Sequence, residues 1–529
     1  MIEDIFAVDI ETDNLDFIVG HIKLISLYNE ECGNVYENIG DIKEILENPN
    51  ILKVFHNAKF DVTWLKYNGI DVNNYTDTMI MAKLLGYENV KLDYLVKVYF
   101  NKELNKELQH SDNWKGDNIS EKHKQYCLDD AKYTFKLYKQ LIKEIKNNNL
   151  KEVLDIEINA LPAIVELTLN GIYLDIDKWM LEINSLENKA KDIELEFKRS
   201  LSKDALNINS PKQIIESFNE KNIPIKSTAD EVLAQFEDLY EEVKLLRKYR
   251  KISKNINTYG YKIQEFLDSE GVIRPSWNQI GAKTGRMSCS KPALQGVPSI
   301  MRKYFKAREG YTFIVADYSQ VELRILAEVS RDSTLIDAYK NDLDLHSITA
   351  SKVLNKPITD ITELERKIGK SLNFGIVYGI TETGIQNQIK KNLNIELTRE
   401  EAMEYRVNFF EAYKGVYTIQ DILLKSQKIK SLGGRGWNDD LKSNQRLNYC
   451  IQGTGADILK TALSYLMKSK NDTWKLCPVV HDEILIEVPK YEANEAKEVL
   501  KNSMELAMNK FVKEVPCKVD IKISDNWCK

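Results

Sequence analysis

The amino-acid sequence predicts a multidomain α/β protein, and three observations support this prediction. The chain has 529 residues, enough for about three or four domains of ordinary size. Strand and helix patterns alternate over residues 1–150, whereas helix patterns fill 151–270 almost alone. Strand patterns return from 271, with a mainly helical block before the last of them. We therefore expect the segments 1–150, 151–270, 271–335, 336–435 and 436–529.

The first segment is typical of an α/β domain. Its strand patterns are IFAVDIET (5–12), FIVGHIKLISLYN (17–29) and ILKVFHN (51–57). Its helix patterns are TDTMIMAKLLG (76–86) and ISEKHKQYCLDDAKYTFKLYKQLIKEI (119–145).

The later segments carry fewer but clear signals. A Ser-Pro helix start lies at INSPKQ (208–213). The strongest later strand patterns are YTFIVADYS (311–319) and CPVVHDEILIEV (477–488), and we interpret each as one strand.

The composition is that of an ordinary globular protein, with 43% hydrophobic and 29% charged residues. The net charge of −6 does not by itself indicate a nucleic-acid binder, although KLLRKYRKISKN (244–255) is a basic patch. Seven scattered cysteines without a CxxC pair predict reduced thiols and no zinc knuckle. The acidic start MIEDIF is unlike a signal peptide, and no apolar run approaches the ~20 residues of a membrane span. We expect a protein of the bacterial or host-cell cytoplasm, without membrane contact.

Acidic residues recur beside the apolar elements of the first segment. Asp9 and Glu11 lie two apart on a strand, so their side chains face the same way. Asp61 follows a later strand, and Tyr126 and Asp130 lie four apart on one helix face. Four converging carboxylates would suit two hard divalent cations, which can act together on a phosphodiester. The alternative is that the D-x-E pair is only a solvated strand face.

These motifs resemble the proofreading 3′–5′ exonuclease domain of the acidic-plus-tyrosine type. DIET, HNAKFD and YCLDDA match its three motifs in order. The resemblance implies an RNase H-like fold in which Asp9 bridges two metals, Glu11 and Asp130 hold one of them, and Asp61 lies near the other. Tyr126 would orient the attacking water. Asp129 lies beside Asp130, but the spacing from Tyr126 favours Asp130.

A second acidic cluster involves two strands far apart in the sequence. Asp317 ends one strand, and Asp482 and Glu483 lie in the middle of another. If the strands pair, the carboxylates meet and cannot all stay ionised without a cation. A two-metal site for phosphoryl transfer would provide that cation. The alternative for Asp482 and Glu483 is a surface-facing edge strand.

A helix between these strands carries two cations followed by two aromatic rings. Arg366, Lys370, Phe374 and Tyr378 recur every four residues and so share one face. This order suits a triphosphate followed by a sugar and base. An amphipathic helix with a basic end is the alternative, but it does not explain the helix-weakening residues Asn373, Gly375 and Gly379.

Together these segments resemble a family A DNA polymerase, the family of bacterial DNA polymerase I. DYSQVELR, RKIGKSLNFGIVYG and HDE match its motifs A, B and C, and KTGRMS, LQGVP and QGTGADILK match further segments. The resemblance implies an exonuclease domain (1–150) followed by a right-hand polymerase with thumb (151–270), palm (271–335 and 436–529) and fingers (336–435). It also leads us to expect that the 5′-nuclease domain of bacterial DNA polymerase I is missing.

The resemblance implies a role for each matching residue. Asp317 and Asp482, with the backbone carbonyl of Tyr318, would hold two Mg²⁺ ions, and Glu483 would support them. Lys370 would act as general acid for pyrophosphate. The residues expected at the incoming deoxynucleotide are Arg366, Lys370, Phe374, Tyr378, Glu322, His346 and Gln320. Those expected at DNA are Arg286, Asn448, Gln452, His481 and Lys254. Glu322 would exclude a ribose 2′-OH.

We therefore expect a template-directed DNA polymerase with proofreading, active in replication, repair or both. Its cofactors would be two Mg²⁺ ions at each site, with Mn²⁺ as a substitute. Its partners would be primer-template DNA and dNTPs, and we expect a monomer. The alternatives are an exonuclease with a degenerate polymerase-like half, a non-catalytic nucleic-acid scaffold, and a single-subunit RNA polymerase.

Three positions depart from the usual family pattern. Asn444 replaces an arginine, with Arg446 displaced by two residues, and Gly296 replaces a frequent asparagine. Phe374 in place of tyrosine implies discrimination against dideoxynucleotides.

Overall fold

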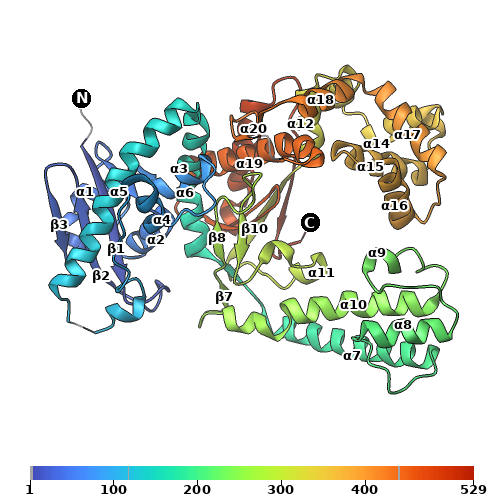
Figure 1. Cartoon of the computed structure of the whole chain (residues 1–529), viewed down its shortest axis with the longest axis horizontal. Coiled ribbons are helices and arrows are strands. Elements are labelled where there is room, and N and C mark those ends of the chain that lie inside the picture. The colour runs from blue at the N-terminus through green and yellow to red at the C-terminus, as the bar shows by residue number, and fades with distance from the viewer. Residues whose placement is uncertain (1–3, 117, 439–440, 529) are drawn as a thin grey trace.

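The computed structural model describes residues 4–116, 118–438 and 441–528. An α/β domain lies at one end of the molecule (blue in Figure 1), and a second sheet lies in the middle. Two helical blocks extend from this second sheet, one with α14 to α17 and one with α7 to α10 (Figure 1). The predicted multidomain α/β fold is confirmed. Among the described helices, none is long and apolar enough to cross a bilayer.

The N-terminal domain is built on a five-stranded mixed sheet of order β3-β2-β1-β4-β5. The central strand β1 is antiparallel to β2 and parallel to β4. The strands are β1 (Ile5–Thr12), β2 (Ile22–Tyr28), β3 (Gly33–Tyr36), β4 (Leu52–Phe55) and β5 (Tyr75–Asp77). The helices are α1 (Lys43–Glu47), α2 (Ala58–Tyr67), α3 (Thr78–Leu84), α4 (Leu92–Phe100) and α5 (Glu121–Asn147). Side chains such as Phe55, Trp64 and Leu141 fill its core.

The predicted strand at 17–29 is shorter in the structure. Strand β2 begins only at Ile22, because residues 13–21 form a turn in which the amide of Asp13 donates to the carbonyl of His21 at 3.2 Å. The predicted helices at 76–86 and 119–145 are confirmed as α3 and α5.

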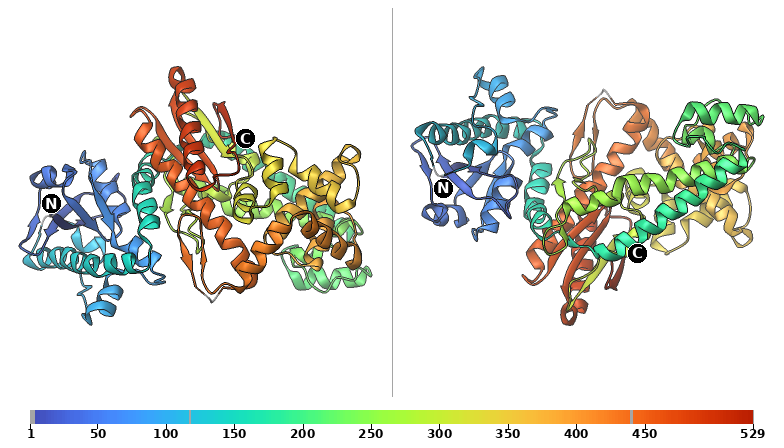
Figure 2. Two further views of the ribbon diagram at one scale, coloured as in Figure 1. Left: turned by 90° about the horizontal axis from the view of Figure 1, so that it is seen from above. Right: turned by 90° about the horizontal axis from the view of Figure 1, so that it is seen from below.

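Helix α6 (Lys151–Asn170) joins the N-terminal domain to the rest of the chain. Its Leu161 and Val165 belong to the N-terminal core, whereas Ala163 and Leu167 belong to the core of the central sheet. In both views of Figure 2 this teal helix stands between the blue domain and the remainder. It therefore packs on two domains, although the predicted thumb range begins at its first residue.

A separate helical unit follows, with its own hydrophobic core that includes Phe197, Phe218 and Leu246. Helix α8 begins as the sequence predicts, since Ser210 caps the amide of Gln213 and Pro211 occupies the first turn. The helices are α7 (Ile176–Ser200), α8 (Pro211–Glu220), α9 (Asp230–Leu233) and α10 (Glu241–Tyr259).

The central sheet has four antiparallel strands in the order β13-β14-β10-β15. They are β10 (Tyr311–Tyr318), β13 (Lys475–Val480), β14 (Glu483–Pro489) and β15 (Val519–Ser524). Three short strand pairs, β6 with β7, β8 with β9 and β11 with β12, lie outside it. Their bounds are β6 (Ile172–Tyr173), β7 (Val272–Ile273), β8 (Ser276–Asn278), β9 (Ser288–Ser290), β11 (Ile429–Lys430) and β12 (Gly436–Trp437).

One strand prediction in this sheet is wrong. Residues 477–488 form a hairpin of two strands, because the chain turns at His481 and Asp482. His481 has a left-handed backbone, with φ of 59°, which a continuous strand does not allow. The turn places Asp482 at the end of the hairpin and Glu483 at the start of β14.

The remaining helices lie around this sheet or in the helical block with α14 to α17. Helix α20 (Ala493–Phe511) packs on the sheet, and α19 (Ser443–Ser469) packs on α20. Helix α12 (Val321–Ser330) packs on α19, and the short α11 (Ser299–Arg302) precedes β10. The others are α13 (Ser333–Lys340), α14 (Leu345–Leu354), α15 (Glu363–Val377), α16 (Glu382–Leu393), α17 (Arg399–Ala412) and α18 (Lys414–Lys425). Helix α15 starts with a capping box between Thr362 and Glu365.

The contact between α14 and α15 depends on a glycine. A Cβ atom placed on Gly369 would lie 2.2 Å from the carbonyl oxygen of His346 and 2.9 Å from the amide of Ala350. We expect Gly369→Ala to separate the two helices and lower the free energy of unfolding by about 1–3 kcal/mol. Urea denaturation of the full chain measures this loss.

Gly455→Ala on α19 is the matched control, because its added Cβ would meet only Ile325 Cδ1, at 3.8 Å. Alanine is the better helix former, so this control should gain up to about 1 kcal/mol. Equal effects of the two substitutions would contradict the close approach.

Candidate active sites

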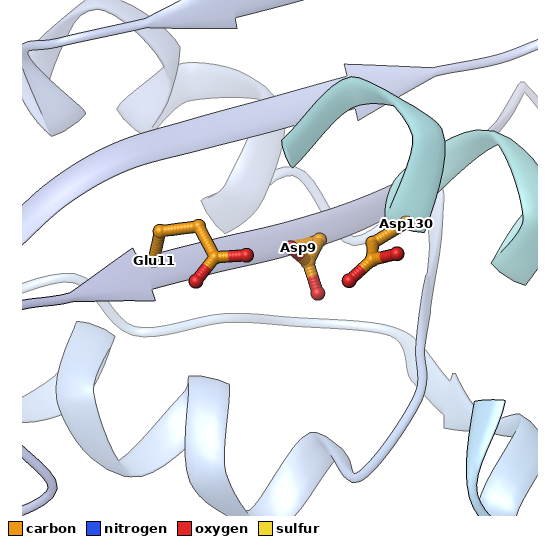
Figure 3. A group of neighbouring side chains, drawn as sticks. All are labelled: Asp9, Glu11 and Asp130. Atoms are coloured by element: carbon orange, nitrogen blue, oxygen red, sulfur yellow. The ribbon is translucent and has the colours of Figure 1, made fainter. Parts of the chain in front are cut away.

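The N-terminal domain gathers carboxylates from a strand and a helix. Strand β1 presents Asp9 and Glu11 on one face, and α5 crosses that face with Asp130. Figure 3 shows Asp9 between the other two side chains. Oxygen atoms of all three lie within 4.8 Å of one another, and these residues form a group able to hold a metal ion. Three of the four acids that the sequence predicts to converge therefore lie together in this group.

Asp61 and Tyr126 complete this constellation. Asp61 lies in the first turn of α2, and its Oδ1 accepts a hydrogen bond of 3.3 Å from the amide of Ile10. Tyr126 lies one turn before Asp130 on α5, and its ring is 6.1 Å from that of Trp114. The neighbouring Asp129 instead accepts a hydrogen bond of 3.1 Å from Gln125.

The carboxylates of this site repel one another. Burial, followed by the charges of its acidic neighbours, raises the pKa of Asp9 well above its ordinary value, and the same causes raise the pKa of Glu11. Burial and the charge of Asp129 raise the pKa of Asp130 to about 7. Burial chiefly raises the pKa of Asp61. Because a bound cation would remove this repulsion, the donor set fits a divalent metal.

The second pair of acids meets at one end of the central sheet. Strand β10 pairs with β14, with Asp317 opposite Glu483. The backbone amide of Tyr318 donates a hydrogen bond of 3.4 Å to the backbone carbonyl of Asp482. Asp317 and Asp482 both line a cavity of about 850 Å³. The strand pairing that the sequence suggested therefore exists.

Glu483 has different surroundings from Asp482. It is buried, with 1% of its surface exposed. Its Oε1 accepts a hydrogen bond of 2.7 Å from Trp527 Nε1, and Arg302 lies 3.5 Å away. The guanidinium of Arg302 also stacks 4.6 Å from the Trp527 ring. These contacts explain how a carboxylate is tolerated inside this sheet and exclude the exposed-edge alternative for Glu483.

Most of the predicted nucleotide-binding residues line the same cavity. They are Lys370, Phe374 and Tyr378 from the region of α15, and Tyr318, Gln320 and Glu322 from the end of β10 and the start of α12. Two other predicted residues are engaged nearby. Arg366 donates from Nε to Asp344 Oδ2 at 2.6 Å, and His346 is buried with its Nδ1 3.0 Å from Asn373 Nδ2.

The predicted DNA-binding residues lie on four parts of the chain. Arg286 and His481 line the cavity, and Arg286 forms an ion pair with Glu322. Asn448 and Gln452 lie on α19, one to two turns before Gly455, which also lines the cavity. Lys254 is exposed on α10. At the departure from the family pattern, Arg446 donates from Nε to the carbonyl of Leu441 at 3.2 Å.

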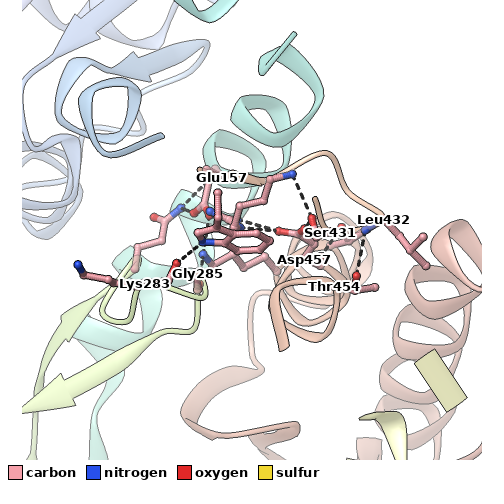
Figure 4. Close-up of polar contacts among 12 residues, drawn as sticks. Glu157, Lys283, Gly285, Ser431, Leu432, Thr454 and Asp457 are labelled. Carbon is pink, nitrogen blue, oxygen red and sulfur yellow. Dashed lines mark hydrogen bonds and ion pairs between the residues drawn. The ribbon is translucent and has the colours of Figure 1, made fainter. Parts of the chain in front are cut away.

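Sequence reasoning missed a buried charge network beside the cavity (Figure 4). Glu157 of α6 contacts Arg435 and Lys460, and Arg435 contacts Asp457. All four side chains are buried. The sequence does contain a signal for this network. Glu157 lies inside one apolar helix pattern, and Asp457 and Lys460 lie inside another. Charges at such positions are usually paired.

The chain was compared with family models and with known proteins. Residues 180–529 match the family model "DNA polymerase family A", and residues 2–146 match the model "3′–5′ exonuclease". DNA polymerase I of Aquifex aeolicus is 34% identical, over 96% of this chain and 94% of that protein. DNA polymerase I of Borreliella burgdorferi is 33% identical over 98% of this chain, which spans 62% of that longer relative.

A solved structure has the same fold over nearly the whole chain. It is described as the POL domain of Pol1 from M. smegmatis in complex with DNA primer-template and dNTP. The TM-score is 0.87 at 24% identity, covering 99% of this chain and 96% of that one.

The family matches cover both carboxylate sites. They favour two working sites over an exonuclease with a degenerate polymerase half, and the enzyme carries out template-directed DNA synthesis with 3′–5′ exonuclease activity. Such domains use divalent metals, in keeping with the carboxylate cluster. The chain belongs to DNA polymerase family A and carries a 3′–5′ exonuclease domain ahead of its polymerase domain.

Proposed function

We propose that the polymerase site extends a DNA primer with dNTPs, using two Mg²⁺ ions held by Asp317, Asp482 and the carbonyl of Tyr318. The observation that carries this proposal is the cavity of about 850 Å³, which brings both carboxylates together with Lys370, Phe374 and Tyr378. The bound cations would stabilise charge on the attacking and leaving oxygens of phosphoryl transfer. The structural match to a polymerase in complex with DNA primer-template and dNTP supports the choice of substrate.

Different side chains around this cavity contact the phosphates, the sugar and the base of the nucleotide. Lys370 faces the phosphates and donates the proton that pyrophosphate takes up on leaving. Arg366, now paired with Asp344, lies one turn earlier on α15 and adds positive charge for the triphosphate. Phe374 and Tyr378 contact sugar and base by stacking. Glu322 rejects a ribose 2′-OH, and Gln320 and His346 complete the nucleotide site.

The DNA contacts follow from the elements that surround the cavity. Arg286 and Gln452 contact minor-groove acceptors near the primer end, which A·T and T·A pairs share, so that pair shape is tested without reading sequence. Asn448 and His481 position the primer strand. Lys254, on the thumb helix α10, contacts backbone phosphates.

The exonuclease site removes the 3′-terminal nucleotide of a primer. Asp9, Glu11, Asp61 and Asp130 hold two Mg²⁺ ions, for which Mn²⁺ can substitute. Tyr126 orients the attacking water through its hydroxyl. We further propose a cytoplasmic monomer that acts in DNA replication, repair or both.

The first test separates the two sites. We expect Asp9→Ala to lose degradation of a labelled primer by about a thousandfold while keeping extension, because a lost metal ligand removes several kcal/mol of transition-state stabilisation. We expect Asp317→Ala to lose extension by a similar factor and to keep degradation. A gel assay with Mg²⁺, with and without dNTPs, measures both activities. Primer extension by Asp317→Ala at the wild-type rate would refute the palm assignment.

The second test concerns the sugar of the nucleotide. Phe374 lines the cavity, and its ring is 6.1 Å from that of His346. We expect Phe374→Tyr to raise dideoxynucleotide incorporation relative to dNTP at least about tenfold, because its hydroxyl supplies a polar contact where the 3′-OH is missing. Single-nucleotide incorporation gives the ratio of kcat/KM values. Phe374→Leu is the control and should not raise it, so an unchanged ratio in Phe374→Tyr would contradict the role.

The third test uses the raised pKa values of the exonuclease site. Without metal, the folded site keeps protons that the unfolded chain releases, so stability falls as pH rises from the ordinary Asp value of 3.8 to about 7, the pKa of Asp130. We expect Asp130→Asn to lose less thermal stability across this window in EDTA, and Mg²⁺ to raise the wild-type Tm more at pH 8 than at pH 5. Equal Mg²⁺ shifts at both pH values would contradict the proton–metal competition.

A further inference from the structure

Side chains from other segments hydrogen-bond the loop that carries Arg286, and three of these contacts lie next to the buried charge network. This loop, residues 279–287, joins β8 to β9. Gln279 Nε2 donates to Glu157 Oε2 at 2.6 Å. Trp437 Nε1 donates to the carbonyl of Lys283 at 2.7 Å, and Lys460 Nζ donates to the carbonyl of Gly285 at 2.8 Å. Figure 4 shows these contacts around Glu157, Lys283 and Gly285.

The third contact lies directly before Arg286. Within the loop, the amides of Gly281 and Ala282 donate to the carbonyl of Arg286 at 2.9 and 3.1 Å. Gly285 has φ of +90°, and a Cβ atom there would lie 2.5 Å from Arg435 Nε. The backbone at Gly285 therefore packs between Lys460 and the guanidinium of Arg435, which fixes where the Arg286 side chain leaves the loop.

Glu157 is the residue on which these contacts converge. Its Oε1 accepts from Lys460 Nζ at 2.6 Å and from Arg435 Nη2 at 2.5 Å. Its backbone carbonyl also accepts from Gln279 Nε2, at 2.7 Å. Burial alone would raise the pKa of Glu157, but Lys460 and Arg435 together lower it below its ordinary value. Glu157 is thus a buried anion that orients both cations beside Gly285.

We propose that Glu157, on the helix that packs against the exonuclease core, is a positioning residue for Arg286 in the polymerase site. Loss of its charge removes the ion-pair partner of Lys460 and leaves Arg435 paired with Asp457 alone. The contact of Lys460 with Gly285 then loses its fixed position, and Arg286 no longer meets the primer terminus in one orientation. The inference rests on the proposed contact of Arg286 with DNA.

The test is a double-mutant cycle between Glu157→Gln and Arg286→Ala, measured as kcat/KM for primer extension by the full chain. We expect a loss of about tenfold for Glu157→Gln, the scale of one charged hydrogen-bond contact. Because Glu157 acts through Arg286, the double variant should be no slower than Arg286→Ala alone. Degradation of single-stranded DNA should stay within about twofold of wild type, since the exonuclease site does not use Arg286.

Two further variants separate positioning from general stability. Glu166→Gln alters another buried carboxylate on α6, which pairs with Lys470 at 3.1 Å and does not contact the loop. It should leave primer extension unchanged. Gln279→Met removes the loop's hydrogen bonds to Glu157 but keeps the ion pairs, so it serves if Glu157→Gln does not fold. Gln279→Met should lower kcat/KM for primer extension less than Glu157→Gln does. Its effect should likewise not add to that of Arg286→Ala.

The outcomes are distinct. Losses that multiply in the double variant, or a parallel loss of exonuclease activity, overturn the inference alone. A loss in Glu166→Gln equal to that in Glu157→Gln also overturns it, because any weakened α6 would then suffice. Unchanged extension by Arg286→Ala overturns the proposed role of Arg286 itself, and the inference with it. Non-additive losses with an intact exonuclease support both.

Discussion

The ion network around Glu157 is the constraint on which the arrangement of the two halves depends. Four charged side chains from three segments meet out of contact with water, and each has a partner of opposite sign. Removing one member of such a network leaves an uncompensated buried charge, which is far more costly than losing a surface ion pair. The network therefore fixes α6 against α19 in one position. Since α6 also packs into the exonuclease core, the relative position of both active sites follows from it.

Further hydrogen bonds join the N-terminal domain to the rest of the chain. Lys59 of α2 donates to the carbonyl of Trp277 at 2.8 Å, and Lys83 of α3 donates to Asn278 Oδ1 at 3.1 Å. Both acceptors belong to β8, the strand that leads into the loop with Arg286. The exonuclease domain is thus not a separate body on a linker. It contacts β8, the strand next to the loop that carries Arg286.

The two carboxylate sites bring acids together through different arrangements of strands and helices. In the exonuclease domain, a strand and a helix bring acids together, and burial, followed by the charges of acidic neighbours, raises the pKa of each. At the central sheet, a hairpin turn and a strand end bring Asp482 to Asp317. Glu483 is kept apart from this site by Trp527 and Arg302. Adjacent acids in the sequence therefore have different surroundings.

The sequence by itself determined which chemistry is present. The spacing of Asp9, Glu11 and Asp130, the four-residue stripe from Arg366 to Tyr378 and the order of the motifs are local patterns, and helix and strand periodicity convert them into shared faces. The hairpin at His481 was missed, because strand-forming apolar residues lie on both sides of the short polar stretch His481, Asp482 and Glu483, and the whole segment was interpreted as one strand. The packing of α6 on two domains was also not visible in its own helical pattern.

Only the tertiary structure decided how the charged residues are partnered. Arg366 pairs with Asp344. Glu157 pairs with Arg435, which lies 278 residues later in the chain. A local pattern shows that a charge lies in an apolar segment and needs a partner. It does not show which one, because burial and pairing depend on contacts that form only when distant segments pack together.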